Sequence, residues 1–75
     1  MSLRDAVNQS LVTYFDQMGD EMPTGLYEMV ISEVERPLLS HVMQQAQNNQ
    51  CKAAQMLGLN RGTLRKKLKH YQLID

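Results

Sequence analysis

A broad apolar stripe follows the helical period from residue 26 to residue 46. Its members recur at steps of three and four, as on one side of an α-helix, and they are Leu26, Tyr27, Val30, Ile31, Val34, Leu38, Leu39, Val42, Met43 and Ala46. The stripe is wider than one neighbouring helix of the same chain would cover. A chain of 75 residues has few other elements to place against it, and a lone core of this size rarely supplies more than about 3–5 kcal/mol. The sequence therefore predicts a core shared with a partner chain.

The stripe predicts one long helix from about Thr24 or Gly25 to about Ala46, and Pro37 lies within it. Proline removes one backbone hydrogen bond and clashes with the carbonyl of the residue four positions earlier. Because the apolar period continues unchanged through Pro37, we expect one bent helix rather than two helices.

A second apolar pattern precedes the long helix. This pattern predicts a first helix. Ser2 and Asp5 have the spacing of a capping box at the start of that helix, and Gly19 ends the helix, since glycine accepts positive φ. The loop at 19–25 contains two glycines and one proline, so the two helices should fold back on each other. The residues that predict this first helix, over 3–18, are Leu3, Val7, Leu11, Tyr14, Phe15 and Met18.

The last third of the chain has the spacing of a helix-turn-helix. A polar turn at 47–49 precedes a short helix over 50–57, and a second turn at 58–60 precedes a last helix from residue 61 to about residue 70. No stretch has the alternation of a strand. The sequence thus predicts an all-α chain of four helices, with residues 1–75 in a single domain.

Small and apolar residues occupy the positions that a helix-turn-helix requires. Ala54 lies where the two helices cross closely, and Gly58 lies at the turn, where positive φ costs little only for glycine. Asn60 can cap the last helix. The apolar residues that hold the two helices together are Leu57, Leu59, Leu64 and Leu68.

Charge divides the chain into two unlike halves. The whole chain has eight basic and eight acidic residues. Residues 1–46 hold two basic and seven acidic residues, a net charge of −5, whereas residues 47–75 hold six basic and one acidic, a net charge of +5. This asymmetry is typical of an acidic scaffold followed by a basic functional end.

The outward side of the last helix carries the side chains that bind DNA in such motifs. Asparagine and arginine reach base edges in the major groove, and lysines at positions 66, 67 and 69 extend toward phosphates. A solvated basic helix is the ordinary alternative, but the helix-turn-helix spacing over the same residues favours double-stranded DNA. The residues of this side are Asn60, Arg61, Thr63, Arg65, Lys66 and Lys69.

Other classes of protein are excluded by what the sequence lacks. A single cysteine, Cys51, excludes an intrachain disulfide, and with the distant His41 and His70 it cannot form a structural zinc site. No Ser/His/Asp, Cys/His or paired-carboxylate arrangement is present, so we expect no enzyme, cofactor or small-molecule substrate. No apolar run approaches the ~20 residues that cross a bilayer, and the absence of disulfides suits a reducing cytoplasm.

Several further residues are expected in structural roles. Glu33 and Glu35 should be solvated or paired with Arg36, and His70 should meet the helix dipole or a phosphate. Methionine is flexible and fills irregular gaps, so we expect core positions for Met18, Met22, Met29, Met43 and Met56.

Four segments resemble the factor for inversion stimulation (Fis) family, nucleoid-associated DNA-bending proteins of bacteria. Residues 60–69, Asn-Arg-Gly-Thr-Leu-Arg-Lys-Lys-Leu-Lys, are similar to its recognition helix, and residues 34–39, Val-Glu-Arg-Pro-Leu-Leu, to its kinked dimer helix. Leu3-Arg4-Asp5 and Tyr14-Phe15 are similar to its first helix. The resemblance implies a homodimer in which residues 3–46 interlock as a four-helix core and residues 50–70 bind DNA.

The resemblance also implies a role for each site residue. Asn60 and Arg61 would face bases, with Arg61 on guanine. Backbone phosphates would be held by Thr63, Arg65, Lys66, Lys67 and Lys69, together with Asn49 and Gln50 at the start of the preceding helix. The implied function is sequence-tolerant DNA binding and bending, with transcription regulation in the cytoplasmic nucleoid and a role as recombination cofactor.

The chain departs from the family pattern in the turn before the helix-turn-helix. Gln47 and Asn48 stand where arginine and glycine are usual, and Cys51 replaces a threonine, so we expect weaker flanking DNA contacts. Gln44 and Gln50 match positions that the family uses near RNA polymerase, which is a further candidate partner. Family members contact a recombinase through an arm ahead of the first helix, and the chain begins at that helix.

Two other functions are compatible with the same pattern. The chain could be a detached Fis-type DNA-binding domain of an enhancer-binding activator. Alternatively, it could be a helical module whose basic helix binds an acidic protein.

Overall fold

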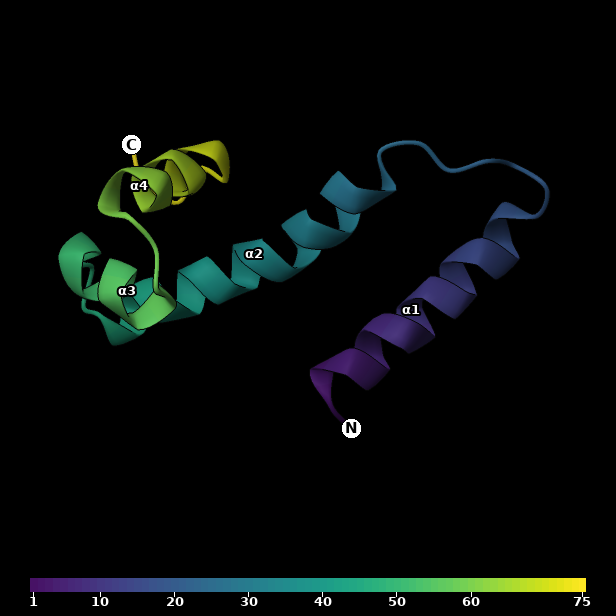
Figure 1. Ribbon diagram of the computed structural model, residues 1–75, viewed down its shortest axis with the longest axis horizontal. Helices are drawn as coiled ribbons and strands as arrows, with labels where there is room; N and C mark the ends of the chain where they lie inside the picture. Colours follow the sequence, from purple (N-terminus) through teal and green to yellow (C-terminus); the bar gives the residue numbers. More distant parts are fainter.

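The computed structural model describes residues 1–75 and contains four helices and no strand. The helices are α1 (Leu3–Met18), α2 (Leu26–Gln45), α3 (Gln50–Leu57) and α4 (Arg61–His70). Figure 1 shows α1 and α2 as two long rods joined by the loop, with α3 and α4 gathered at the far end of α2. The predicted all-α class and the helix-turn-helix are confirmed.

The start and end of α1 follow the predicted signals. The Ser2 hydroxyl accepts a hydrogen bond from the Asp5 N–H at 3.1 Å, and the Asp5 carboxylate accepts one from the Ser2 N–H at 3.2 Å. Gly19 follows the helix with φ 64° and ψ −123°, a conformation open mainly to glycine. As predicted, α2 continues through Pro37 as one helix.

The same backbone motif ends α2, α3 and α4. A residue with left-handed φ follows each helix: Gln47 (54°), Gly58 (73°) and Gln72 (58°). Its N–H bonds to the carbonyl three residues earlier, and the next N–H bonds to the carbonyl five residues earlier, at 2.8–3.2 Å. This is the Schellman arrangement, in which glycine is the usual left-handed residue. Two of the three positions therefore carry a glutamine in a conformation that favours glycine.

All buried residues lie between positions 39 and 71. The core joins the second half of α2 to the helix-turn-helix, and its members are Leu39, Met43, Ala46, Ala53, Ala54, Leu64, Leu68 and Tyr71. By contrast, α1 has no buried residue. The helix-turn-helix is thus built on the end of α2, while the apolar sides of α1 and the first half of α2 stay uncovered within one chain.

The methionine prediction was wrong for most of its members within a single chain. Only Met43 belongs to the core, whereas Met22 is 85% exposed, Met56 51% and Met29 41%. Met22 lies in the loop between α1 and α2, where no other element covers it. Met56 is on α3, where only Ala53 and Ala54 are buried.

Candidate nucleic-acid interface

Asparagine side chains cap both helices of the helix-turn-helix. The Asn49 side-chain oxygen accepts from the Lys52 N–H at 3.2 Å, and the Asn60 side-chain oxygen accepts from the Gly62 N–H at 2.7 Å. A Cβ atom at Gly62 would lie 3.2 Å from that Asn60 oxygen, so glycine leaves room for the cap. The Asn60 amide nitrogen keeps its two hydrogens for another partner.

The orientation of α4 is fixed by its apolar side. Leu64 and Leu68 are fully buried, so the residues on the opposite side of the helix face solvent. Four basic residues of α4 are exposed, and we call them together the basic face: Arg61, Arg65, Lys66 and Lys69. Thr63 is exposed on its flank.

A side-chain contact brings the starts of α3 and α4 together. The Arg61 guanidinium donates to the Cys51 Sγ at 3.3 Å. Both helix N-termini therefore lie close to each other, with exposed Asn49 and half-buried Gln50 at the start of α3. A helix N-terminus offers free N–H groups and a partial positive charge to an anion.

The basic face carries no compensating carboxylate. The chain forms a single salt bridge, and it involves Lys67 rather than any residue of the basic face. The exposed guanidinium and ammonium groups can consequently bind an external anion without first leaving an internal carboxylate.

Lys67 differs from its neighbours because α2 holds its side chain. The Lys67 ammonium lies 2.8 Å from Glu35 Oε2, and the Tyr71 hydroxyl donates to Glu35 Oε1 at 2.6 Å. We call these three residues the α2–α4 clasp. Beside them, Arg36 donates to the Tyr71 carbonyl at 3.2 Å and lies 5.3 Å from the centre of the Tyr71 ring. The His70 ring also packs edge-on against that ring, at 4.9 Å.

The bonds of the clasp shift the pKa values of its members. The hydrogen bonds from Lys67 and then Tyr71 lower the pKa of the Glu35 carboxyl. The same carboxylate raises the pKa of the Lys67 ammonium and of the Tyr71 hydroxyl. At neutral pH the clasp thus consists of a carboxylate, an ammonium and a neutral phenol.

Local spacing did not predict the partner of Glu35. We expected Glu35 to be solvated or paired with the adjacent Arg36, but its partners lie 32 and 36 residues further along the chain. The adjacent residue instead contacts Tyr71. No periodicity within α2 or α4 signals this pairing, because it depends on how the two helices pack.

Comparison with known proteins places the chain in a family. Residues 30–71 match the family described as bacterial regulatory protein, Fis family. The chain belongs to the Fis family. The match covers most of α2 and all of α3 and α4, so it includes the basic face and the α2–α4 clasp. Membership in a family of regulatory proteins agrees with the prediction that the chain is not an enzyme.

Several Fis relatives are similar over nearly the whole chain. The DNA-binding protein Fis of Proteus mirabilis is 58% identical over 69 residues, which make up 92% of this chain and 70% of that protein. The DNA-binding protein Fis of Mannheimia haemolytica is also 58% identical, and that of Actinobacillus succinogenes is 59% identical, with the same coverage. The similarity therefore extends beyond the helix-turn-helix into α1.

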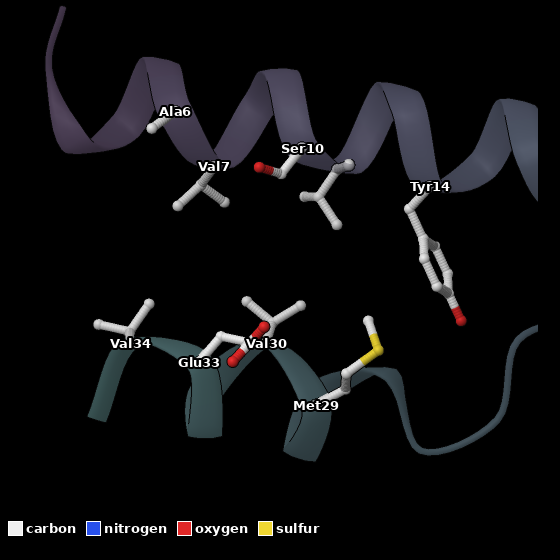
Figure 2. A pocket seen from close by; sticks show the side chains of 9 residues that line it. Ala6, Val7, Ser10, Tyr14, Met29, Val30, Glu33 and Val34 are labelled. Carbon is white, nitrogen blue, oxygen red and sulfur yellow. The ribbon is translucent and has the colours of Figure 1, made fainter. Parts of the chain in front are cut away.

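A groove of about 390 Å³ lies between α1 and α2, and Figure 2 shows side chains of both helices directed toward it. Most of its lining is apolar: Ala6, Val7, Ser10, Leu11, Tyr14, Met29, Val30, Glu33 and Val34.

The chain offers neither a cluster of metal ligands nor a membrane-spanning helix. No three histidine, cysteine or carboxylate side chains lie together as metal ligands. None of the four helices combines the length and apolarity of a membrane span.

Proposed function

We propose that the chain is a homodimeric, sequence-tolerant DNA-binding and DNA-bending regulator of the bacterial nucleoid. The basic face carries this proposal, because it sets four unpaired cations on the exposed side of the second helix of a helix-turn-helix. The relatives named DNA-binding protein Fis support DNA as the partner.

Within the proposed complex, base and phosphate contacts are divided along α4. Asn60 and Arg61 at its leading end face base edges, and Arg61 on guanine provides roughly 1–3 kcal/mol of discrimination. The residues proposed to hold phosphates are Asn49, Gln50, Thr63, Arg65, Lys66 and Lys69. Lys67, which was predicted with them, is paired with Glu35 instead. Because few side chains touch bases, most of the affinity is independent of sequence.

The dimer is supported by the surface that one chain leaves uncovered. A compact monomer of 8.6 kDa exposes about 4,700 Å², whereas this chain exposes 6072 Å². Its radius of gyration is 15.1 Å, against about 11 Å for a compact domain of this length. The excess is roughly 1,400 Å² per chain, or roughly 2,800 Å² for two chains, which falls in the range of obligate homodimers. The groove between α1 and α2 is the proposed seat of the partner's helices.

Bending follows from the proposed two-fold arrangement. A dimer holds two copies of α4 at a fixed separation. The family resemblance places them closer than one turn of straight B-DNA, so the duplex must curve and narrow its central minor groove. A/T-rich sequence permits this deformation at lower cost. The preferred site therefore has G and C near its ends and A/T pairs at its centre.

Regulatory contacts form part of the same proposal. Gln44 lies exposed in the last turn of α2 and Gln50 opens α3, so the two flank the connecting turn. This surface would meet RNA polymerase. The proposed function also includes a role as recombination cofactor. DNA inversion assays with the matching recombinase test this role.

A salt-series anisotropy titration tests the proposal. It compares a duplex with an A/T-rich centre and outer G/C pairs against one with a G/C-rich centre. We expect the first to bind at least several-fold tighter, and Arg61→Ala to abolish the preference for the outer guanine. With six to eight phosphates neutralised per dimer, log affinity should fall against log salt with a slope of about −5 to −7. Equal binding to both duplexes would contradict the bending mechanism.

A further inference from the structure

We infer that the α2–α4 clasp sets the angle of α4 against α2 and thereby the curvature imposed on bound DNA. In this role Glu35, Lys67 and Tyr71 are positioning residues, and Lys67 does not bind phosphate. The inference rests on the proposed function, because it concerns the geometry with which the dimer presents its two basic faces.

The clasp grips the last turn of α4 from two successive residues of α2. Both oxygens of Glu35 are occupied, at 2.8 Å by Lys67 and at 2.6 Å by Tyr71. The next residue, Arg36, bonds to the Tyr71 carbonyl at 3.2 Å. Tyr71 is only 5% exposed, so its ring is anchored in the core while its hydroxyl reaches α2.

Partial shielding distinguishes Lys67 from the lysines of the basic face. The Lys67 side chain is 34% exposed and that of Glu35 is 23% exposed. On a helix with 100° per residue, Lys67 lies beside the buried Leu64 and Leu68, a full 100° away from Lys66. A phosphate would have to displace a carboxylate that already satisfies the Lys67 charge, whereas Lys66 is exposed and has no such partner.

The clasp and the base-contacting residues lie at opposite ends of α4. Asn60 and Arg61 stand at its leading end, and Lys67 and Tyr71 at its last turn. A helix of ten residues is about 15 Å long, so a rotation of about 10° about its far end moves the leading end by roughly 2–3 Å. A two-fold dimer repeats this displacement on the other half-site. A small change at the clasp is consequently converted into a change of several ångströms in the separation that DNA must match.

Two adjacent lysines provide a matched test. Lys66→Met and Lys67→Met make the same chemical change on neighbouring residues of the full-length protein. Log affinity is measured against log salt on the A/T-centred duplex, and the DNA bend is measured by energy transfer between dyes at the duplex ends. Lys66→Met should reduce the magnitude of the salt slope by about 2, since each dimer loses two phosphate contacts. Lys67→Met should leave the slope unchanged, reduce the bend and lower the preference for the A/T-centred duplex by about threefold or more.

A second pair of variants separates positioning from folding. Tyr71→Phe keeps the buried ring and removes only the hydroxyl that bonds to Glu35, so its thermal unfolding should stay cooperative. It should reduce the bend as Lys67→Met does. Thr13→Val is the control, because it also removes one hydroxyl from a hydrogen bond, here the bond to the Gln9 carbonyl within α1; its bend should equal that of the unchanged protein.

The outcomes keep this inference distinct from the proposed function. If the unchanged protein leaves the duplex straight, the proposed bending function is wrong, and the clasp has no bend to set. If the unchanged protein bends DNA but Lys67→Met lowers the salt slope as Lys66→Met does, Lys67 is a phosphate contact and the inference is overturned. The same follows if Tyr71→Phe and the unchanged protein give equal bends.

Discussion

The groove between α1 and α2 leads to a prediction that two neighbouring residues of α1 can decide. Leu11 lines the groove, whereas Val12 is 61% exposed and takes no part in it. The substitutions Leu11→Lys and Val12→Lys introduce the same charged side chain one position apart. If a second chain fills the groove, only the first substitution places an ammonium group in a dimer interface.

The expected cost follows from burial and symmetry. Loss of a buried leucine side chain removes about 1.5–3 kcal/mol, and an unpaired ammonium in an apolar interface adds to this. We therefore expect at least about 3 kcal/mol per chain. A two-fold dimer carries the substitution twice, so the total is about 6 kcal/mol, or a dissociation constant raised about 10⁴-fold. Val12→Lys is a surface change, for which about 0.5 kcal/mol or less is usual.

Sedimentation velocity from nanomolar to micromolar concentration measures the effect, with circular dichroism to report helix content. The unchanged protein and Val12→Lys should sediment as dimers at micromolar concentration. Leu11→Lys should sediment as a monomer with reduced helix content, because α1 has no buried residue of its own. A Leu11→Lys protein that remains as dimeric as Val12→Lys would refute the shared-core argument. So would an unchanged protein that stays a folded monomer throughout.

Three further predictions concern the stability of the helix-turn-helix. Gln72→Gly should raise the free energy of unfolding by about 0.5–1 kcal/mol in urea titrations, because glycine relieves left-handed strain but costs some chain entropy. Gly58→Ala should lower the free energy of unfolding by about 1 kcal/mol for the opposite reason. A Gln72→Gly protein that is less stable than the unchanged protein would contradict the strain at this position. Asn60→Ala should lower stability by about 1 kcal/mol through loss of the cap, whereas Asn60→Asp should retain most of it. The pKa of Glu35 is lowered by folding, so its contribution is present above about pH 4.5 and is lost as pH falls through the folded-state pKa. Thermal unfolding between pH 6 and pH 3 should therefore show a smaller loss of stability for Glu35→Gln than for the unchanged protein, and equal losses would contradict the role of the carboxylate.

The helix boundaries were predictable because short-range signals determine them. Ser2 and Asp5 form the expected capping box, and Gly58 has the expected positive φ at the turn. The left-handed Gln47 and Gln72 were not predictable in the same way, since glycine rules do not identify a glutamine in that conformation. Backbone hydrogen bonds hold these two positions, because the residues that follow them complete the same bonds as in the glycine case.

The basic face was predictable for a similar reason. Arg61, Arg65 and Lys69 are four residues apart, so the helical period places them along one line of α4, and all three are exposed. The period alone could not identify Glu35 as the partner of Lys67, because this contact depends on how α2 and α4 pack. The exposed methionines were mispredicted for a related reason, since the apolar surface of one chain exceeds what that chain can cover.

The zero net charge of the chain reflects two halves that meet at one ion pair. Glu35 belongs to the acidic half and Lys67 to the basic half, and their contact is the only salt bridge in the chain. An isolated exposed ion pair contributes little to stability. This pair matters more for the geometry of the fold, because it and the hydrogen bond from the Tyr71 hydroxyl join α2, the proposed dimer helix, to the end of α4. In the proposed dimer, this contact would set the separation between the two copies of α4.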